Sequence, residues 1–162
     1  MEVVAGSLIA VLGTLLGAAL THVFQRRAAN DAERSRQAEQ IRQERLDAYA
    51  HCGGALMNYR RSVMDRWFAR DEQKPAEVQE ELRYESYRQR SAAEEAVFRV
   101  ELLSDDPALS QLGRDTINRI ATMLAAETNE QLALHRHDSR TWIHEFISTS
   151  KAQLSRGGGS GG

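Results

Sequence analysis

The pattern of apolar and polar positions is helical along the whole chain. Apolar residues recur at spacings of three and four, and no segment shows the two-residue alternation or β-branched clustering of strands. A first helix is predicted to run to about Arg70, and Pro75 and Asp105–Pro107 mark the starts of a second and a third. The apolar stripe is interrupted at His135–Ser139 and resumes at Trp142, which predicts a short fourth helix or a bent continuation. The sequence therefore predicts an all-α protein.

Burial of one apolar stripe on each helix is expected to hold an antiparallel bundle of three to four helices together. The predicted core residues are Tyr59, Val63, Trp67, Val78, Leu82, Val97, Val100, Leu109, Leu112, Ile117, Ile120, Leu124, Trp142, Ile143, Phe146 and Ile147. Residues 25–70 hold ten Arg against six acidic residues, and residues 71–104 hold five basic against nine acidic ones. Opposite charge is expected to select these two helices as neighbours, and Gly53-Gly54 is expected to mark a close helix contact.

An uncharged run over residues 3–24 predicts a transmembrane helix, because its length matches a hydrocarbon core roughly 30 Å thick. The predicted domains are an anchor over 1–24, a charged helical stalk over 25–45, a bundle over 46–156 and a linker-like tail over 157–162. A cleaved signal peptide is the alternative, but it requires a basic segment before the apolar run.

Orientation follows from the arginines that flank the run. The predicted membrane-surface residues are Arg26, Arg27, Arg34 and Arg36, which all follow it. The positive-inside rule therefore predicts a single-pass protein of the cell membrane, with its N-terminus outside and its C-terminal domain cytoplasmic.

One face of the run carries small and hydroxylated side chains within an arc of about 120°. Its predicted helix–helix interface consists of Gly6, Ala10, Gly13 and Gly17. Hydroxyls at seven-residue spacing could line the pore of a homo-oligomeric channel, and the candidates are Ser7, Thr14 and Thr21. The alternative is that these hydroxyls bond their own backbone carbonyls in a closely packed helix pair.

The residue types offer little for catalysis or metal binding. His135, His137 and His144 are near one another in sequence, but a His-x-His pair on one helix points about 200° apart. His51 and Cys52 are adjacent rather than facing, and the chain contains no Glu-x-x-His pair of the kind that builds carboxylate metal sites in bundles. No catalytic residue, metal site or cofactor is predicted, and the protein is not expected to be an enzyme.

The segment GTLLGAALTHVFQRRAANDAERSRQAEQIRQERLDAY, Gly13–Tyr49, resembles small actinobacterial single-pass membrane proteins with an Arg/Glu-rich helix after the span. The resemblance extends to about Arg60 and implies a topology rather than an activity. A net charge of −2 points to no nucleic acid partner, and the single cysteine suits a reducing compartment.

These observations together predict a membrane-anchored, self-associating helical scaffold or adaptor, with a homo-oligomeric channel as the alternative. The expected partners are a second copy of the chain, membrane lipids and an unknown cytoplasmic or membrane protein.

Overall fold

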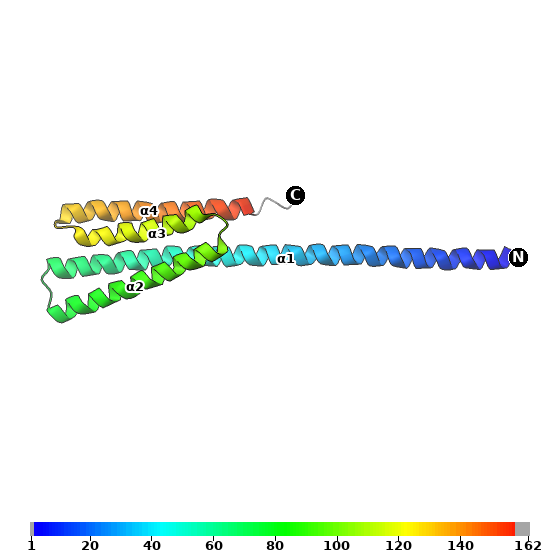
Figure 1. The fold of residues 1–162 in the computed structure, drawn as a ribbon, viewed down its shortest axis with the longest axis horizontal. Helices are drawn as coiled ribbons and strands as arrows, with labels where there is room; N and C mark the ends of the chain where they lie inside the picture. The colour runs from blue at the N-terminus through cyan, green and yellow to red at the C-terminus, as the bar shows by residue number, and fades with distance from the viewer. Residues whose placement is uncertain (1, 158–162) are drawn as a thin grey trace. The chain divides into compact units, whose positions relative to one another are not determined.

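The computed structural model describes the backbone of residues 2–157 and the side chains of residues 25–27 and 29–156. All regular secondary structure in this part of the chain is helical, as the periodicity predicts. The elements are α1 (Glu2–Asp71), α2 (Ala76–Leu103), α3 (Pro107–Ala121), the 3-10 helix η1 (Thr122–Ala125) and α4 (Asn129–Gly157). The chain divides into two compact units, Met1–Ile41 and Arg42–Gly162. In the second unit the C-terminal part of α1 packs with α2, α3 and α4 as a four-helix bundle (Figure 1).

No helix in the described part of the chain is long and apolar enough to cross a membrane. From residue 25 onward, the longest stretch without Asp, Glu, Lys or Arg runs from Ala48 to Tyr59, whereas a span needs about 20 such residues. This finding contradicts three predictions: a transmembrane helix, a single-pass placement in the cell membrane and a channel. The described part of the chain is all-helical and contains no membrane-spanning helix. The run 3–24, on which those predictions rested, lies outside the residues whose side chains are described.

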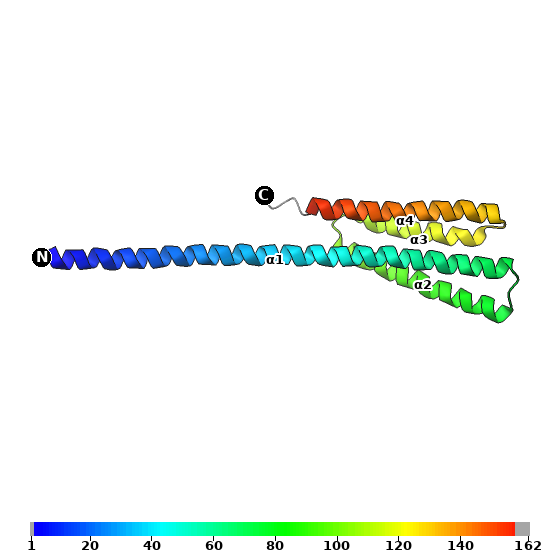
Figure 2. The ribbon, with the colours of Figure 1, turned by 180° about the vertical axis from the view of Figure 1, so that it is seen from behind.

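Contacts between helices fix their order around the bundle. The Arg66 Nη1 of α1 donates to Ser86 Oγ of α2 over 3.3 Å, and α3 packs against both α2 and α4. The ring closes where the Tyr49 hydroxyl of α1 donates to Gln153 Oε1 of α4 over 3.2 Å. The α1/α4 pair and the α2/α3 pair therefore form opposite edges of the bundle, which face the viewer in Figure 2 and Figure 1 respectively.

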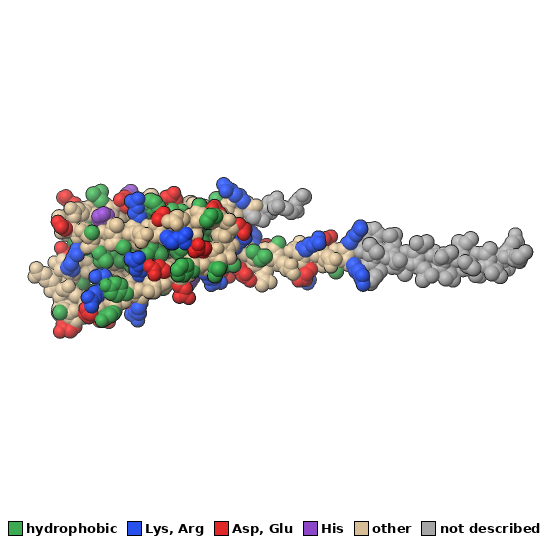
Figure 3. Space-filling view, in the orientation of Figure 1, with side chains coloured by type: hydrophobic (Ala, Val, Ile, Leu, Met, Phe, Trp, Pro, Cys, Tyr) green, Lys and Arg blue, Asp and Glu red, His purple; other side chains and the backbone are tan. Residues whose placement is uncertain are grey.

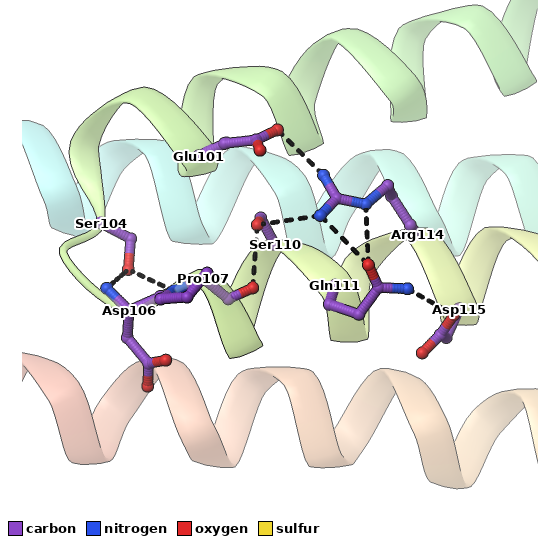
Figure 4. Close-up of polar contacts among 8 residues, drawn as sticks. All are labelled: Glu101, Ser104, Asp106, Pro107, Ser110, Gln111, Arg114 and Asp115. Carbon is purple, nitrogen blue, oxygen red and sulfur yellow. Dashed lines mark hydrogen bonds and ion pairs between the residues drawn. The ribbon is translucent and has the colours of Figure 1, made fainter.

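Proline and aspartate start the helices as predicted. Pro75 precedes α2, and Asp106 caps α3 by accepting the backbone N–H of Ala108 on Oδ1 over 2.9 Å. At this corner, shown in Figure 4, the Arg114 Nη1 of α3 also donates to Glu101 Oε2 of α2 over 2.9 Å. These contacts hold the turn between α2 and α3 in one conformation.

The predicted break at His135–Ser139 is wrong, because α4 runs without interruption from Asn129. The chain breaks earlier, where η1 ends and Ala126 takes an extended conformation. Ser139 is fully buried and donates its hydroxyl to the Arg136 carbonyl over 3.2 Å. A polar residue therefore occupies a core position of α4, and the buried face of the helix continues through the interruption of the apolar stripe.

Most of the predicted core is confirmed. The predicted residues that are buried are Tyr59, Val63, Trp67, Val97, Val100, Leu109, Ile117, Ile120, Ile143 and Phe146. Leu82, Leu112, Leu124 and Trp142 are only half-buried. Val78 and Ile147 are exposed, and their prediction as core residues is wrong.

Trp67 joins α1 to the break between η1 and α4. Its ring is buried, and its indole Nε1 donates to the Ala126 carbonyl over 2.7 Å. The Arg70 Nη2 donates to the same carbonyl over 2.8 Å. The Trp142 ring, by contrast, is half-buried and lies 4.6 Å beneath the guanidinium of Arg119.

Replacing the two tryptophans should therefore give unequal losses of stability. Trp67→Ala should lower the free energy of unfolding by about 3–5 kcal/mol, because it removes a buried ring and a buried hydrogen bond. Trp142→Ala should cost about 1–2 kcal/mol, because its ring is only half-buried. Urea unfolding followed by circular dichroism measures both, and equal losses would contradict the anchoring role of Trp67.

Gly113 and Gly54 offer a matched test of packing in the bundle. A Cβ at Gly113 would lie 2.8 Å from Val97 Cγ2, whereas a Cβ at Gly54 would meet nothing within 4 Å. Gly113→Ala should therefore destabilise the protein by about 1–3 kcal/mol. Gly54→Ala should stabilise it by up to about 1 kcal/mol through helix propensity. Thermal unfolding of the two variants should shift in opposite directions.

Candidate docking surface

An apolar groove of about 420 Å³ lies between α1 and α4, the two helices in front in Figure 2. We call it the α1/α4 groove. Its lining residues are Leu46, Tyr49, Ala50, Gly53, Gly54 and Met57 of α1 and Ile147, Ser150, Lys151 and Leu154 of α4. Apart from Lys151, no charged side chain lines it.

The groove exists because α1 presents small residues where α4 packs on it. A Cβ added to Gly53 would lie 3.5 Å from Ile147 Cγ1, so the Ile147 side chain lies over this glycine. The neighbouring Gly54 faces open space. Leu46, Met57 and Ile147 are each 45 or 46% exposed, which leaves apolar side chains in contact with water. Contiguous exposed apolar surface of this kind is typical of protein-binding sites.

Three arginines lie on the same α1/α4 edge, beyond the Met57 end of the groove. Arg60 Nε donates to Ser139 Oγ over 3.1 Å, and its Nη2 donates to the Arg136 carbonyl over 3.2 Å. Burial, together with the charges of Arg136 and Arg140, lowers the pKa of the Arg60 guanidinium. Among the described residues, neither Arg136 nor Arg140 has a carboxylate partner. We call Arg60, Arg136 and Arg140 the arginine cluster.

A second basic cavity, of about 690 Å³, lies between the end of α1 and the start of α2. Its cations already have partners within the bundle. Arg70 donates to the Leu124 and Ala126 carbonyls, and Lys74 lies 3.1 Å from a carboxylate oxygen of Glu72. This cavity is therefore less available to a ligand than the arginine cluster.

The groove holds no activated nucleophile. The Ser150 hydroxyl donates to the Phe146 carbonyl over 2.8 Å. Cys52 is fully buried, and this burial raises the pKa of its thiol to about 12. The surface can therefore bind an apolar partner with acidic groups at one end, but it offers no group poised for covalent chemistry.

The predicted interface and pore residues are Gly6, Ala10, Gly13, Gly17, Ser7, Thr14 and Thr21, and all lie outside the residues whose side chains are described. Arg26, Arg27, Arg34 and Arg36 are exposed. Arg34 and Arg36 form loose pairs with acids one turn earlier, at 3.8 and 3.9 Å. Their predicted role at a membrane surface rested on the spanning helix that is corrected above.

The three histidines of α4 are not brought together with other ligands. His135 Nδ1 lies 3.4 Å from Thr122 Oγ1. No group of three or more His, Cys, Asp and Glu side chains that could hold a metal occurs in the part of the chain that is described.

Sequence reasoning missed the groove itself. The available signal was Gly53-Gly54, which the sequence analysis assigned to a close helix contact, and only Gly53 makes one. Gly54 is exposed beside Met57 and Ile147 because of the way α4 packs on α1. No local sequence pattern predicts this packing.

The described part of the second unit is a four-helix bundle with an exposed apolar groove between α1 and α4. A model of the KilB plasmid transfer protein family matches residues 46–154. The chain belongs to this family. No curated protein and no solved structure matches the chain. The comparisons show no actinobacterial or membrane-protein family in support of the resemblance drawn from the first part of the sequence.

The family match covers most of the bundle. It begins at Leu46 and ends at Leu154, which line the same end of the α1/α4 groove from opposite helices. The matched residues therefore include the whole groove and the arginine cluster.

The arginine cluster should carry a small cost in stability, because like charges repel. Arg140→Gln should raise the free energy of unfolding by a few tenths of a kcal/mol at low salt, and the gain should vanish at high salt. Arg88→Gln is the control, because Arg88 is paired with Glu85 and its loss should be neutral or slightly destabilising. Chemical unfolding at two salt concentrations measures both. A loss of stability in Arg140→Gln would mean that this cation stabilises the bundle.

Proposed function

We propose that this chain acts in plasmid transfer as a non-catalytic helical scaffold that self-associates and binds through its α1/α4 groove. The observation that carries the proposal is the groove, an apolar surface left open on an otherwise well-packed bundle. The assignment to plasmid transfer rests on the family match, because the family is described as a plasmid transfer protein family.

The shape of the groove favours a helix as its occupant. Two antiparallel helices leave a straight channel between them, and Leu46 to Met57 cover about 17 Å of α1 at 1.5 Å per residue. A helix laid into such a channel buries residues at spacings of three and four. Gly54, which faces open space, provides close approach for its backbone.

The chemistry of the lining supports binding rather than catalysis. Its hydroxyl groups, on Tyr49 and Ser150, donate to acceptors within the bundle. No pair of lining side chains has the arrangement of a nucleophile and its base. The binding energy is expected from Leu46, Met57 and Ile147, which remain partly exposed in the free bundle.

Filling the groove should abolish the function without unfolding the protein. Gly54→Trp places a ring in open space and improves helix propensity, so the variant should fold. In cells that contain the variant as the only copy of this chain, the frequency of plasmid transfer should fall at least about tenfold, equivalent to about 1.4 kcal/mol of binding.

Ala152→Trp adds the same ring at an exposed position of α4 that points away from the groove and the arginine cluster, and this variant should transfer like the wild type. Circular dichroism and thermal unfolding establish that both variants are folded. Normal transfer by a folded Gly54→Trp protein would overturn the assignment of the groove.

A further inference from the structure

The outward face of α2 is a second exposed apolar surface. Tyr84, Tyr87, Phe98 and Leu102 are 58, 52, 60 and 85% exposed. At about 100° per residue they fall within an arc of about 60°. Figure 3, which shows the α2/α3 edge, has hydrophobic side chains along α2. We call these four residues the α2 stripe. Their spacing, together with Ser91 between them, matches the seam of a helix that packs against other helices.

Most of the exposed large apolar residues of the described bundle lie on these two surfaces. Leu46, Met57 and Ile147 line the α1/α4 groove. Val78 and Leu134 are the exceptions among the described residues from 42 onward. The bundle therefore has one apolar groove and one apolar ridge, and they lie on opposite edges.

The charges around the two surfaces are complementary. Several glutamates of α2 form ion pairs with arginines, and these are Glu80, Glu85, Glu94 and Glu101. Glu77, Glu81 and Glu95 have no such partner among the described residues, and by helical phase they project on the same side as the α2 stripe. Arg99 projects on that side as well, which leaves a net excess of two carboxylates there. The α1/α4 edge carries the arginine cluster and Lys151 instead.

We propose that the occupant of the α1/α4 groove is the α2 stripe of a second copy of this chain. The proposal rests on the scaffold function proposed above and identifies one partner for it. Phe98 and Leu102 of one copy fill the apolar part of the groove, against Gly54, Met57 and Ile147 of the other. With α2 antiparallel to the α1 that it contacts, Glu95 lies toward the arginine cluster.

This contact is heterologous, because the ridge and the groove are different surfaces of the same molecule. Each bound copy still presents a free groove on one edge and a free α2 stripe on the other. Such contacts build closed rings or open filaments rather than symmetric dimers. Assembly should therefore proceed beyond the dimer, and it should weaken with salt because unpaired charges flank both surfaces.

Two single variants test the assignment by sedimentation velocity of the full chain over a range of concentrations. Ile147→Glu blocks the groove and Phe98→Glu blocks the stripe, and both residues are exposed enough for the bundle to remain folded. Each variant alone should be monomeric, whereas the wild type should form larger species. Leu134→Glu, an exposed site on neither surface, should assemble like the wild type.

Mixing the two variants gives the sharper result. An equimolar mixture contains one type of chain with an intact stripe and another with an intact groove. It should form heterodimers and nothing larger. In each heterodimer the groove left over carries Ile147→Glu and the stripe left over carries Phe98→Glu, so neither can bind a further chain. Isologous contacts between two grooves or between two stripes cannot produce this pattern.

The outcomes separate the two proposals. A wild-type chain that stays monomeric, or a Phe98→Glu variant that assembles like the wild type, overturns the α2 assignment. If Ile147→Glu then still abolishes plasmid transfer, the scaffold function stands with another occupant in the groove. If Ile147→Glu changes neither assembly nor transfer, the scaffold function falls as well.

Discussion

The hydrogen bond from the Trp67 indole to the Ala126 carbonyl sets the register of the bundle. The chain leaves helical geometry at Ala126, so this carbonyl has no partner within a helix, and a buried unpaired carbonyl would cost about 1–3 kcal/mol. Trp67 and Arg70 both donate to it. The break between η1 and α4 is therefore stable in the interior only beside the end of α1.

That register determines which residues of α1 and α4 meet along the rest of the edge. From Ala126 onward the contacts proceed antiparallel, with Arg60 beside Ser139, then Gly53 beside Ile147, then Tyr49 beside Gln153. The groove opens where this sequence of contacts brings the glycines against α4. Since Gly54 adds no side chain, Met57 and Ile147 remain exposed on either side of a channel. The groove is thus a consequence of packing that is fixed about three turns or more away.

Local signals in the sequence predicted the helices well and the surfaces poorly. Pro75 and Asp106-Pro107 mark helix starts because their effect on the backbone is local. Ser139 concealed the continuity of α4, since a hydroxyl that bonds its own helix can occupy a core position. Ile147 has the spacing of a core residue, yet it lies at the edge of the apolar stripe of α4. The neighbouring helices do not cover the full width of this stripe, so Ile147 stays exposed. Which edge of a stripe stays exposed depends on neighbouring helices, and a single sequence does not contain that information.

The first two helices were predicted to carry opposite charge and to be selected as neighbours by it. The ion pairs of the structure do not support this role for the charges. The positive first helix and the negative second helix do lie side by side (Figures 1 and 2), but the ion pairs of α2 are mostly within the helix, such as Arg83 with Glu80 and Arg90 with Glu94. Exposed pairs of this kind contribute about 0–1 kcal/mol, too little to select a packing partner against apolar burial. Burial of Val97 and Val100 places α2, and its remaining carboxylates are directed to solvent. The opposite charges of the two helices are therefore available for contacts between molecules, where weak and screened attraction is enough to orient a partner whose affinity comes from apolar contact.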